Sequence, residues 1–374
     1  MSVAEPFEVS IPGGVFDDLR QRLARTNWFG QPSGEGWDLG VDVAYLRELC
    51  AHWAESYDEQ HLAALLNQWP NRRWEGLHLI HAGEGNGPPV VLLHGWPSGP
   101  LLYAKVIPLL LAAGHEVIVP SLPGFAWSED PGRPLSVADV SQRLRDLLEH
   151  GLGHRRYAVS GQDWGAAIAA RMAWDAPDTV AALHIATLSV LPPPGDLEQP
   201  PLSEPELDFL ARGQAWRRRE GFHLFLQTTV PDALAVGLAD SPAGLAAWLV
   251  EKYRRWSDCD GLVERRFSKD DLCDFLTMYW ATGTIASSMR LYLGERRGRW
   301  RFEKGQRIAV PAGVAVFPAD IVPAPRDWAE RIFSELRRFT EMPRGGHFSA
   351  WEEPQLLVED LLALLEPEQA RLQV

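Results

Sequence analysis

The chain has 374 residues, 46% of them hydrophobic, with a formal net charge of −14 and a pI near 5.3. This length allows a large buried core together with an inserted or appended piece. The acidic balance argues against binding a polyanion or an anionic membrane surface, so no nucleic acid is expected as a partner.

The three cysteines, Cys50, Cys259 and Cys273, match no metal-ligand spacing and cannot all pair with one another. They indicate reduced thiols, which are usual in the cytoplasm. Residues 1–15 show neither a signal-peptide core nor an anchor, and no window approaches the roughly 18 apolar residues that a membrane span needs. We therefore expect a cytoplasmic protein without a membrane anchor.

Residues 1–85 are predicted to form a mainly helical N-terminal arm that wraps the catalytic core. Apolar residues recur at helical spacing over 17–26, 41–56 and 61–68. The tryptophans of this part are expected to be buried hydrophobic mass rather than a binding surface. From residue 77 the period changes, and 77–81 is typical of an edge strand.

Residues 86–191 and 300–374 are predicted to form the two parts of an α/β core. Short apolar strands alternate there with helices, which predicts a mostly parallel sheet covered by helices on both faces. The expected strands are 90–93, 116–120, 157–159, 180–185 and 314–317, and the expected helices are 101–111, 137–150, 328–333 and 353–365.

Between residues 192 and 299 this alternation stops. The segment has helical patterns separated by prolines, and it is rich in tryptophan, phenylalanine and tyrosine. A helical insertion between two parts of an α/β core predicts a lid.

The stretch from Tyr157 to Ala170 carries the motif around which the chain is organised. A short apolar strand leads into a sharp turn, and a helix rich in small residues follows. Gly161 and Gly165 flank Asp163 with the spacing of a nucleophile elbow, in which a strained backbone lifts one side chain above the sheet. A carboxylate at this place attacks an sp3 carbon that bears a leaving group. Opening an epoxide and displacing a halide both fit this chemistry.

His347 is the candidate base because it lies in a glycine-flanked loop after the last strand. The order nucleophile, acid, histidine is the one expected for this elbow. Asp320, just beyond the strand 314–317, is the favoured acid and would accept the ring N–H of His347. Glu352 and Glu353 compete with it by proximity, but acidic residues at the start of a helix are expected from the helix dipole alone.

Two backbone N–H groups are expected to form the oxyanion hole. One belongs to Trp164, directly after the nucleophile, and the other to Trp96, in the loop after the first core strand. The alternative is that both residues are simply core tryptophans. His94, just before this loop, is predicted to be structural.

The motifs together resemble a known family, the microsomal-type epoxide hydrolases, which include juvenile hormone epoxide hydrolases and bacterial relatives. The residues that carry the resemblance are His-Gly-Trp-Pro at 94–97, Gly-Gln-Asp-Trp-Gly at 161–165, the lid phrase 240–253, Arg-Gly-Gly-His-Phe at 344–348 and the following Glu-Glu-Pro at 352–354. The resemblance runs nearly end to end and includes the N-terminal region. It implies an α/β-hydrolase fold with a helical lid and a helical N-terminal arm, in a bacterial member.

The resemblance also implies a mechanism. Asp163 would attack an epoxide carbon while lid tyrosines bind the opening oxygen, and His347, oriented by Asp320, would activate the water that hydrolyses the resulting ester. The Trp96 and Trp164 amides would hold the oxyanion, and a vicinal diol would leave. The partners would be a small-molecule epoxide and water, with no cofactor and no metal.

The lid departs from the family pattern in one place. The second lid tyrosine is present as Tyr292, after Thr-Gly-Thr-Ile at 282–285. The first is absent, and either Phe222 or His223 takes its place. Phenylalanine could only pack there, whereas histidine could still form a hydrogen bond. The many aromatic residues of the lid favour an apolar epoxide, such as an aryl epoxide.

Two other functions compete with epoxide hydrolysis. A haloalkane dehalogenase would keep Asp163 and His347. That family has a different residue at the place of Trp96 in the oxyanion loop, and it needs no lid tyrosine such as Tyr292. A hydrolase fold kept as a binding module should have lost at least one catalytic residue. The physiological substrate, the stereochemistry and a possible homo-oligomeric state stay open.

Overall fold

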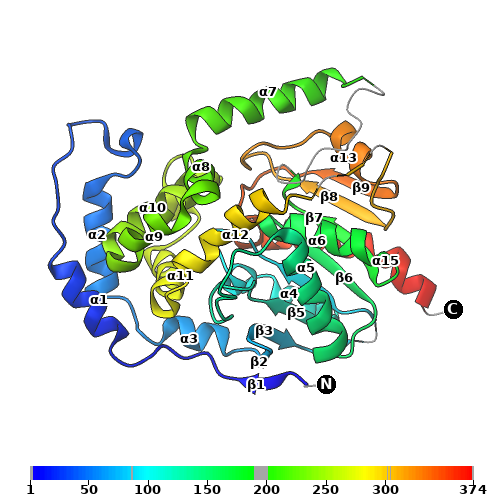
Figure 1. Cartoon of the computed structure of the whole chain (residues 1–374), viewed down its shortest axis with the longest axis horizontal. Helices are drawn as coiled ribbons and strands as arrows, with labels where there is room; N and C mark the ends of the chain where they lie inside the picture. The colour runs from blue at the N-terminus through cyan, green and yellow to red at the C-terminus, as the bar shows by residue number, and fades with distance from the viewer. Residues whose placement is uncertain (1–2, 86, 189–200, 301, 304, 373–374) are drawn as a thin grey trace.

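The centre of the molecule is a nine-stranded sheet in the described part of the chain (Figure 1). The structure is a computed structural model that describes residues 3–85, 87–188, 201–300, 302–303 and 305–372. The strand order is β1-β2-β3-β5-β4-β6-β7-β8-β9, antiparallel from β1 to β5 and parallel from β5 to β9. The strands are β1 (Glu5–Phe7), β2 (Asn71–Trp74), β3 (Leu77–Ala82), β4 (Val90–Leu93), β5 (Val117–Pro120), β6 (Tyr157–Gly161), β7 (Val180–Ile185), β8 (Ala312–Val316) and β9 (Leu336–Glu341).

Helices cover both faces of this sheet. On one face α5 packs on α6, which contacts β4, β6 and β7; on the other α4 packs on α15, which contacts β7, β8 and β9. The central strands are buried along their whole length, as apolar strands between two helical layers must be. The predicted α/β fold is confirmed. These helices are α4 (Ile107–Ala112), α5 (Val137–Asp146), α6 (Trp164–Asp175) and α15 (Pro354–Leu372), with α13 (Arg326–Ile332) and α14 (Ser349–Glu352) near the C-terminus.

The segment predicted as a lid is mainly helical over its described residues, 201–299. Proline begins α9 and α10, where a missing N–H costs nothing, and so divides the lid into short helices. The expected start of the lid, 192–200, lies outside the described residues. The lid helices are α7 (Glu204–Arg219), α8 (Phe222–Thr229), α9 (Pro231–Asp240), α10 (Pro242–Trp256), α11 (Lys269–Thr282) and α12 (Ile285–Arg297).

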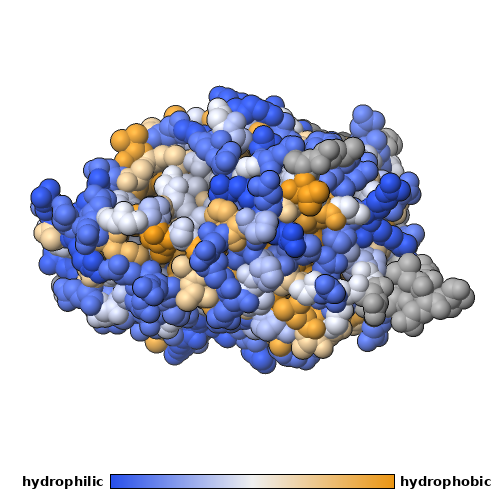
Figure 2. Space-filling view, turned by 90° about the horizontal axis from the view of Figure 1, so that it is seen from below, coloured by the Kyte–Doolittle hydropathy of each residue, from blue (hydrophilic) through white to orange (hydrophobic). Residues whose placement is uncertain are grey.

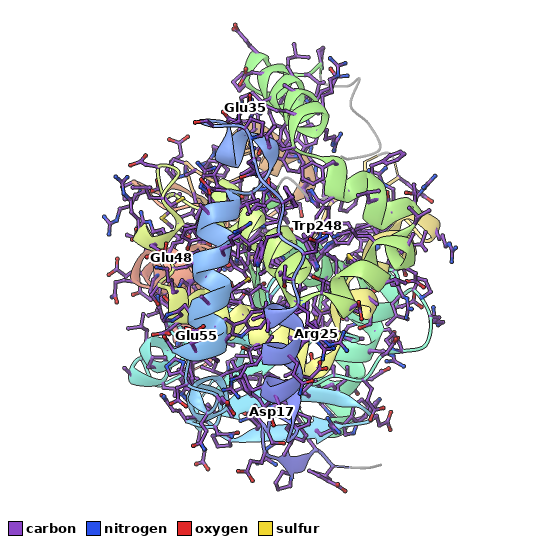
Figure 3. The ribbon with its side chains drawn as sticks, turned by 90° about the vertical axis from the view of Figure 1, so that its left-hand side faces the viewer. Asp17, Arg25, Glu35, Glu48, Glu55 and Trp248 are labelled. Atoms are coloured by element: carbon purple, nitrogen blue, oxygen red, sulfur yellow. The ribbon has the colours of Figure 1, made fainter. Side chains whose placement is uncertain are left out.

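The N-terminal arm differs from the expectation of a helical wrap around the core. Its helices α1 (Val15–Ala24), α2 (Val43–Glu55) and α3 (His61–Leu66) contact lid helices α10 and α11. Figure 3 looks onto α1 and α2, which lie in front of the lid helix that carries Trp248. The rest of the arm supplies β1, β2 and β3 to the sheet. The arm therefore extends the core and holds the lid.

The prediction of an edge strand at 77–81 is wrong. β3 lies between β2 and β5, because β2 and β3 form a hairpin that β1 extends. The hairpin turns at Glu75 and Gly76, which both have positive φ, as a two-residue hairpin turn prefers. The Glu-Gly pair between Trp74 and Leu77 was the local signal for this hairpin.

The surface is mainly hydrophilic on the face shown in Figure 2, where apolar residues form small separate groups. No single described helix is long and apolar enough to cross a membrane. Helices α9 and α10 would be so only if taken together, and a bend of 118° separates them.

Candidate active site

Asp163 lies in a tight turn between β6 and α6, with φ at 53° in the left-handed region. The turn is possible because the residues two positions before and after Asp163, Gly161 and Gly165, lack side chains. A Cβ at Gly161 would lie 2.3 Å from the carbonyl oxygen of Gly165, and one at Gly165 would lie 1.9 Å from that of Leu93. The strained backbone thus raises the carboxylate at the carboxyl edge of the sheet, as the elbow motif predicts.

The oxyanion loop approaches this carboxylate from β4. The Trp96 N–H donates to Oδ1 of Asp163 at 2.8 Å. A Cβ at Gly95 would lie 2.0 Å from the same oxygen, so this approach needs glycine. Trp164 is the first residue of α6, where backbone N–H groups have no acceptor within the helix. Both predicted donors therefore lie beside Asp163.

His347 and Asp320 complete a buried charged trio with Asp163. His347 Nδ1 donates to Asp320 Oδ1 at 2.6 Å, and its Nε2 lies 3.5 Å from Asp163 Oδ2. The loop that carries His347, residues 344–348, is called the histidine loop below. A parallel bridge between Ala319 and Gly346 aligns the loop after β8 with this histidine loop. The structure thus brings together the three residues that chain order alone had suggested.

The charges of the trio keep His347 protonated in the free enzyme. Burial lowers the pKa of His347, but the carboxylates of Asp320 and Asp163 outweigh burial and raise it to about 10. An imidazolium between two carboxylates cannot accept a proton. Removal of either negative charge would lower the pKa of His347 and make its imidazole a better base.

Tyr292 of α12 reaches the site from the lid. Its ring is buried, edge-on to Trp164 at 4.8 Å and to Trp96 at 5.9 Å between ring centroids. Burial, followed by the charge of Asp163, raises the pKa of its hydroxyl well above the usual value. The hydroxyl therefore stays protonated and can donate a hydrogen bond.

The structure places His223 in the site and Phe222 outside it. His223 is 2% exposed and stacks on Trp96 at 5.9 Å, whereas Phe222 is 43% exposed and contacts Trp248. The Nδ1–H of His223 donates to the Glu220 carbonyl at 3.4 Å. Burial, then the charge of Lys252, lowers the pKa of His223 to about 3, so the ring is neutral and its Nε2 carries a lone pair.

Several residues of the site were not predicted from the sequence. The side-chain amide of Gln162 donates to the His347 carbonyl at 3.0 Å, and the Trp256 carbonyl accepts the His347 N–H at 2.7 Å. The hydroxyls of Tyr253 and Tyr279 donate to the carbonyls of Pro97 and Ser98 in the oxyanion loop. Gln162 could have been found inside the elbow motif. The others come from the lid, and no local signal links them to the core.

One group of described residues has the composition of a metal site. His81, Glu116 and His154 offer ligand atoms within 4.8 Å of one another. Glu116 Oε1 lies 2.5 Å from His81 Nε2 and 3.0 Å from His154 Nε2, so hydrogen bonds account for the cluster. The cluster lies where β5 and β6 begin, at the amino ends of these parallel strands, whereas Asp163 lies at their carboxyl ends.

The elbow geometry predicts that Gly165→Ala destabilises the protein strongly, because the added methyl would overlap the Leu93 carbonyl. The matched control is Gly213→Ala in α7, where a Cβ meets nothing within 4 Å. Alanine should stabilise that helix by about 0.5–1 kcal/mol. Thermal unfolding of both variants is the measurement. A Gly165→Ala variant as stable as wild type would contradict the close approach.

The trio predicts that stability depends on pH through His347. Its pKa is raised from 6.5 to about 10, so the stabilisation is fully present below 6.5 and is lost as pH rises through about 10. The melting temperature of wild type should therefore fall over this range relative to His347→Gln. Parallel melting curves for the two proteins across these pH values would exclude an imidazolium at this place.

Comparisons with known proteins agree with the geometry. A family model of the α/β hydrolase fold matches residues 88–271, and one of the epoxide hydrolase N terminus matches residues 4–101. A relative from Stigmatella aurantiaca is 36% identical over 372 residues, covering 95% of this chain and 83% of the relative. Epoxide hydrolase 1 of Oryctolagus cuniculus is 31% identical over 396 residues, covering 95% of this chain and 87% of that protein.

Solved structures give the same result. Juvenile hormone epoxide hydrolase from the silkworm Bombyx mori superposes with a TM-score of 0.87 at 29% identity, covering 100% of this chain and 96% of that one. Aspergillus niger epoxide hydrolase superposes with a TM-score of 0.83 at 26% identity, covering 97% and 96%. The resemblance of the motifs is confirmed, and the chain belongs to the microsomal-type epoxide hydrolase family.

Proposed function

We propose that this epoxide hydrolase converts an apolar epoxide into a vicinal diol through an ester of Asp163. The observation that carries the proposal is the buried trio, in which a carboxylate held by the Trp96 N–H faces the imidazole of His347, with the Tyr292 ring packed on Trp96. The relatives named for epoxide hydrolysis support the reaction class.

In the first step, Oδ2 of Asp163 forms a bond to one epoxide carbon. The carbon–oxygen bond of the ring breaks, and its electron pair goes to the epoxide oxygen. The buried hydroxyl of Tyr292 donates to this oxygen as its charge develops. Oδ1 stays on the Trp96 N–H and becomes the carbonyl oxygen of the ester.

Formation of the ester prepares the second step. Asp163 loses its negative charge, so one of the two carboxylates that raise the pKa of His347 disappears. His347 then gives its Nε2 proton to the alkoxide oxygen formed in the first step, and the neutral Nε2 can take a proton from a water molecule. The resulting hydroxide adds to the ester carbonyl, and the Trp96 and Trp164 amides hold the oxyanion. The bond between this carbon and the diol oxygen then breaks, the diol oxygen takes the proton of the new carboxyl group, and the Asp163 carboxylate and the His347 imidazolium are restored.

The walls of the site favour an apolar substrate. Three tryptophans, Trp96, Trp164 and Trp256, surround the trio together with Tyr292. Flat aromatic walls suit an aryl group beside the epoxide, because rings pack well edge-on and offset.

The ester predicts a covalent adduct in a variant that lacks the base. His347→Gln should be alkylated by an aryl epoxide such as styrene oxide but not regenerated, so intact-protein mass spectrometry should show one added epoxide mass. The control Asp163→Ala should show none. Haloalkanes tested in parallel should leave no adduct on His347→Gln. Failure of His347→Gln to accumulate an adduct with any hydrolysed epoxide would reject the ester.

Tyr292 and His223, the two lid residues that contact Trp96, are predicted to contribute unequally to alkylation of Asp163. Tyr292→Phe should slow alkylation by roughly 10²-fold, the lower range for loss of a general acid. His223→Phe should slow it by less than about tenfold, because its Nδ1–H is used by Glu220 and its neutral Nε2 donates nothing. Phe222→Ala is the matched control and should alkylate at the wild-type rate. Stopped-flow tryptophan fluorescence measures this step; equal losses for Tyr292→Phe and His223→Phe would contradict the assignment.

A further inference from the structure

Glu352 has a different place from the one that the helix dipole suggested. It ends the short helix α14, and its side chain is fully buried. Its carboxylate accepts three backbone N–H groups, from Asp258 at 2.7 Å, Phe348 at 3.0 Å and Gly346 at 3.2 Å. A buried carboxylate is costly unless such donors compensate it, so these bonds define where the group and its donors must lie.

Two of the three donors flank the base. Gly346 and Phe348 stand on either side of His347, whose own N–H donates to the Trp256 carbonyl at the end of α10. Three consecutive amides of the histidine loop are therefore fixed by buried acceptors. The direction of the His347 side chain follows from these bonds, because it projects from the middle residue.

The third donor belongs to the lid. Asp258 lies two residues beyond α10, and its side chain accepts the Gly345 N–H at 2.9 Å. Arg266 donates to the Asp258 carbonyl at 2.7 Å and to Glu353 at 2.8 Å. The lid segment after α10 and the histidine loop of the core are thus joined at one carboxylate.

We propose that Glu352 is a positioning residue that holds His347 in line for ester hydrolysis and makes this alignment depend on the docked lid. With Glu352 in place, His347 is a competent base only while Asp258 and Trp256 of the lid sit against its loop. The inference rests on the proposed ester mechanism, because hydrolysis of the ester is the step that needs the base.

Alkylation and hydrolysis should therefore respond differently to a change at Glu352. Asp163 is held by the elbow and by Trp96, which Glu352 does not contact, so attack on the epoxide needs no help from it. A glutamine at position 352 offers one acceptor oxygen, and its amide group would face N–H donors. At least one of the three amides then loses its acceptor, and the histidine loop shifts.

The test is a comparison of Glu352→Gln with Glu353→Gln in the full-length enzyme. Glu353 is the adjacent buried carboxylate, but its partners are the side chains of Arg266 and Arg344. We expect Glu352→Gln to alkylate within about twofold of the wild-type rate and to hydrolyse the ester at least tenfold more slowly. Adduct should then accumulate during turnover of styrene oxide, whereas Glu353→Gln should accumulate none.

A second readout tests the link to the lid. Hydrogen exchange should quicken in the segments around Asp258 and around Gly346 in Glu352→Gln but not in Glu353→Gln. If Glu352→Gln does not fold, Glu352→Asp decides the matter: its shortened carboxylate should give partial accumulation of adduct. Equal slowing of both steps, no slowing, or the same adduct in Glu353→Gln would overturn the positioning role.

The outcome for His347→Gln separates this inference from the mechanism on which it rests. If His347→Gln accumulates adduct and Glu352→Gln does not, only the positioning role fails. If neither accumulates adduct, the ester mechanism itself is wrong.

Discussion

The structure depends on enclosing one imidazole between two carboxylates away from solvent. Asp163, His347 and Asp320 are each buried or nearly so, and the pKa of His347 is about 10 because the two negative charges outweigh burial. Buried charges are tolerated only when paired and hydrogen-bonded. The elbow, the oxyanion loop and the clamped histidine loop supply those bonds: each places a backbone donor or acceptor where a charged or catalytic group requires it. In the proposed mechanism the same balance of charge sets the order of the two steps, since ester formation neutralises Asp163 and so lowers the pKa of His347.

Exclusion of water from this trio depends on the lid, and the lid in turn depends on the N-terminal arm. Trp53 of α2 donates its indole N–H to Thr277 at 2.8 Å, and Tyr57 and His61 bind the buried carboxylate of Asp274 on α11. The arm continues into the β2–β3 hairpin of the sheet, so one segment of the chain connects the lid to the core (Figures 1 and 3).

The sequence predicts the features that depend on residues close together in the chain. Strand and helix periods, the glycines around Asp163 and the glycine-flanked His347 each follow from short-range geometry, and the resemblance supplied the order of the site. The β2–β3 hairpin that places β3 inside the sheet had a local signal in Glu75 and Gly76, whereas the pairing of β1 with β2 across more than sixty residues of chain could not be read in the same way. The arm's contact with the lid is equally non-local. Glu352 was visible as an acidic helix residue, but its role needs the fold of two distant loops.

The choice between Phe222 and His223 shows the limit most sharply. Adjacent residues on a helix point about 100° apart, so a shift of one residue decides which faces the site. Packing on Trp96 and Trp256 selects His223, and the hydrogen bond to the Glu220 carbonyl then fixes its tautomer. The resemblance of the motifs predicts a tyrosine donor at this place, whereas the neutral His223 ring presents a lone pair. In the proposed mechanism the opening oxygen therefore receives a hydrogen bond from Tyr292 and not from His223, although the two rings lie side by side with centroids 6.2 Å apart.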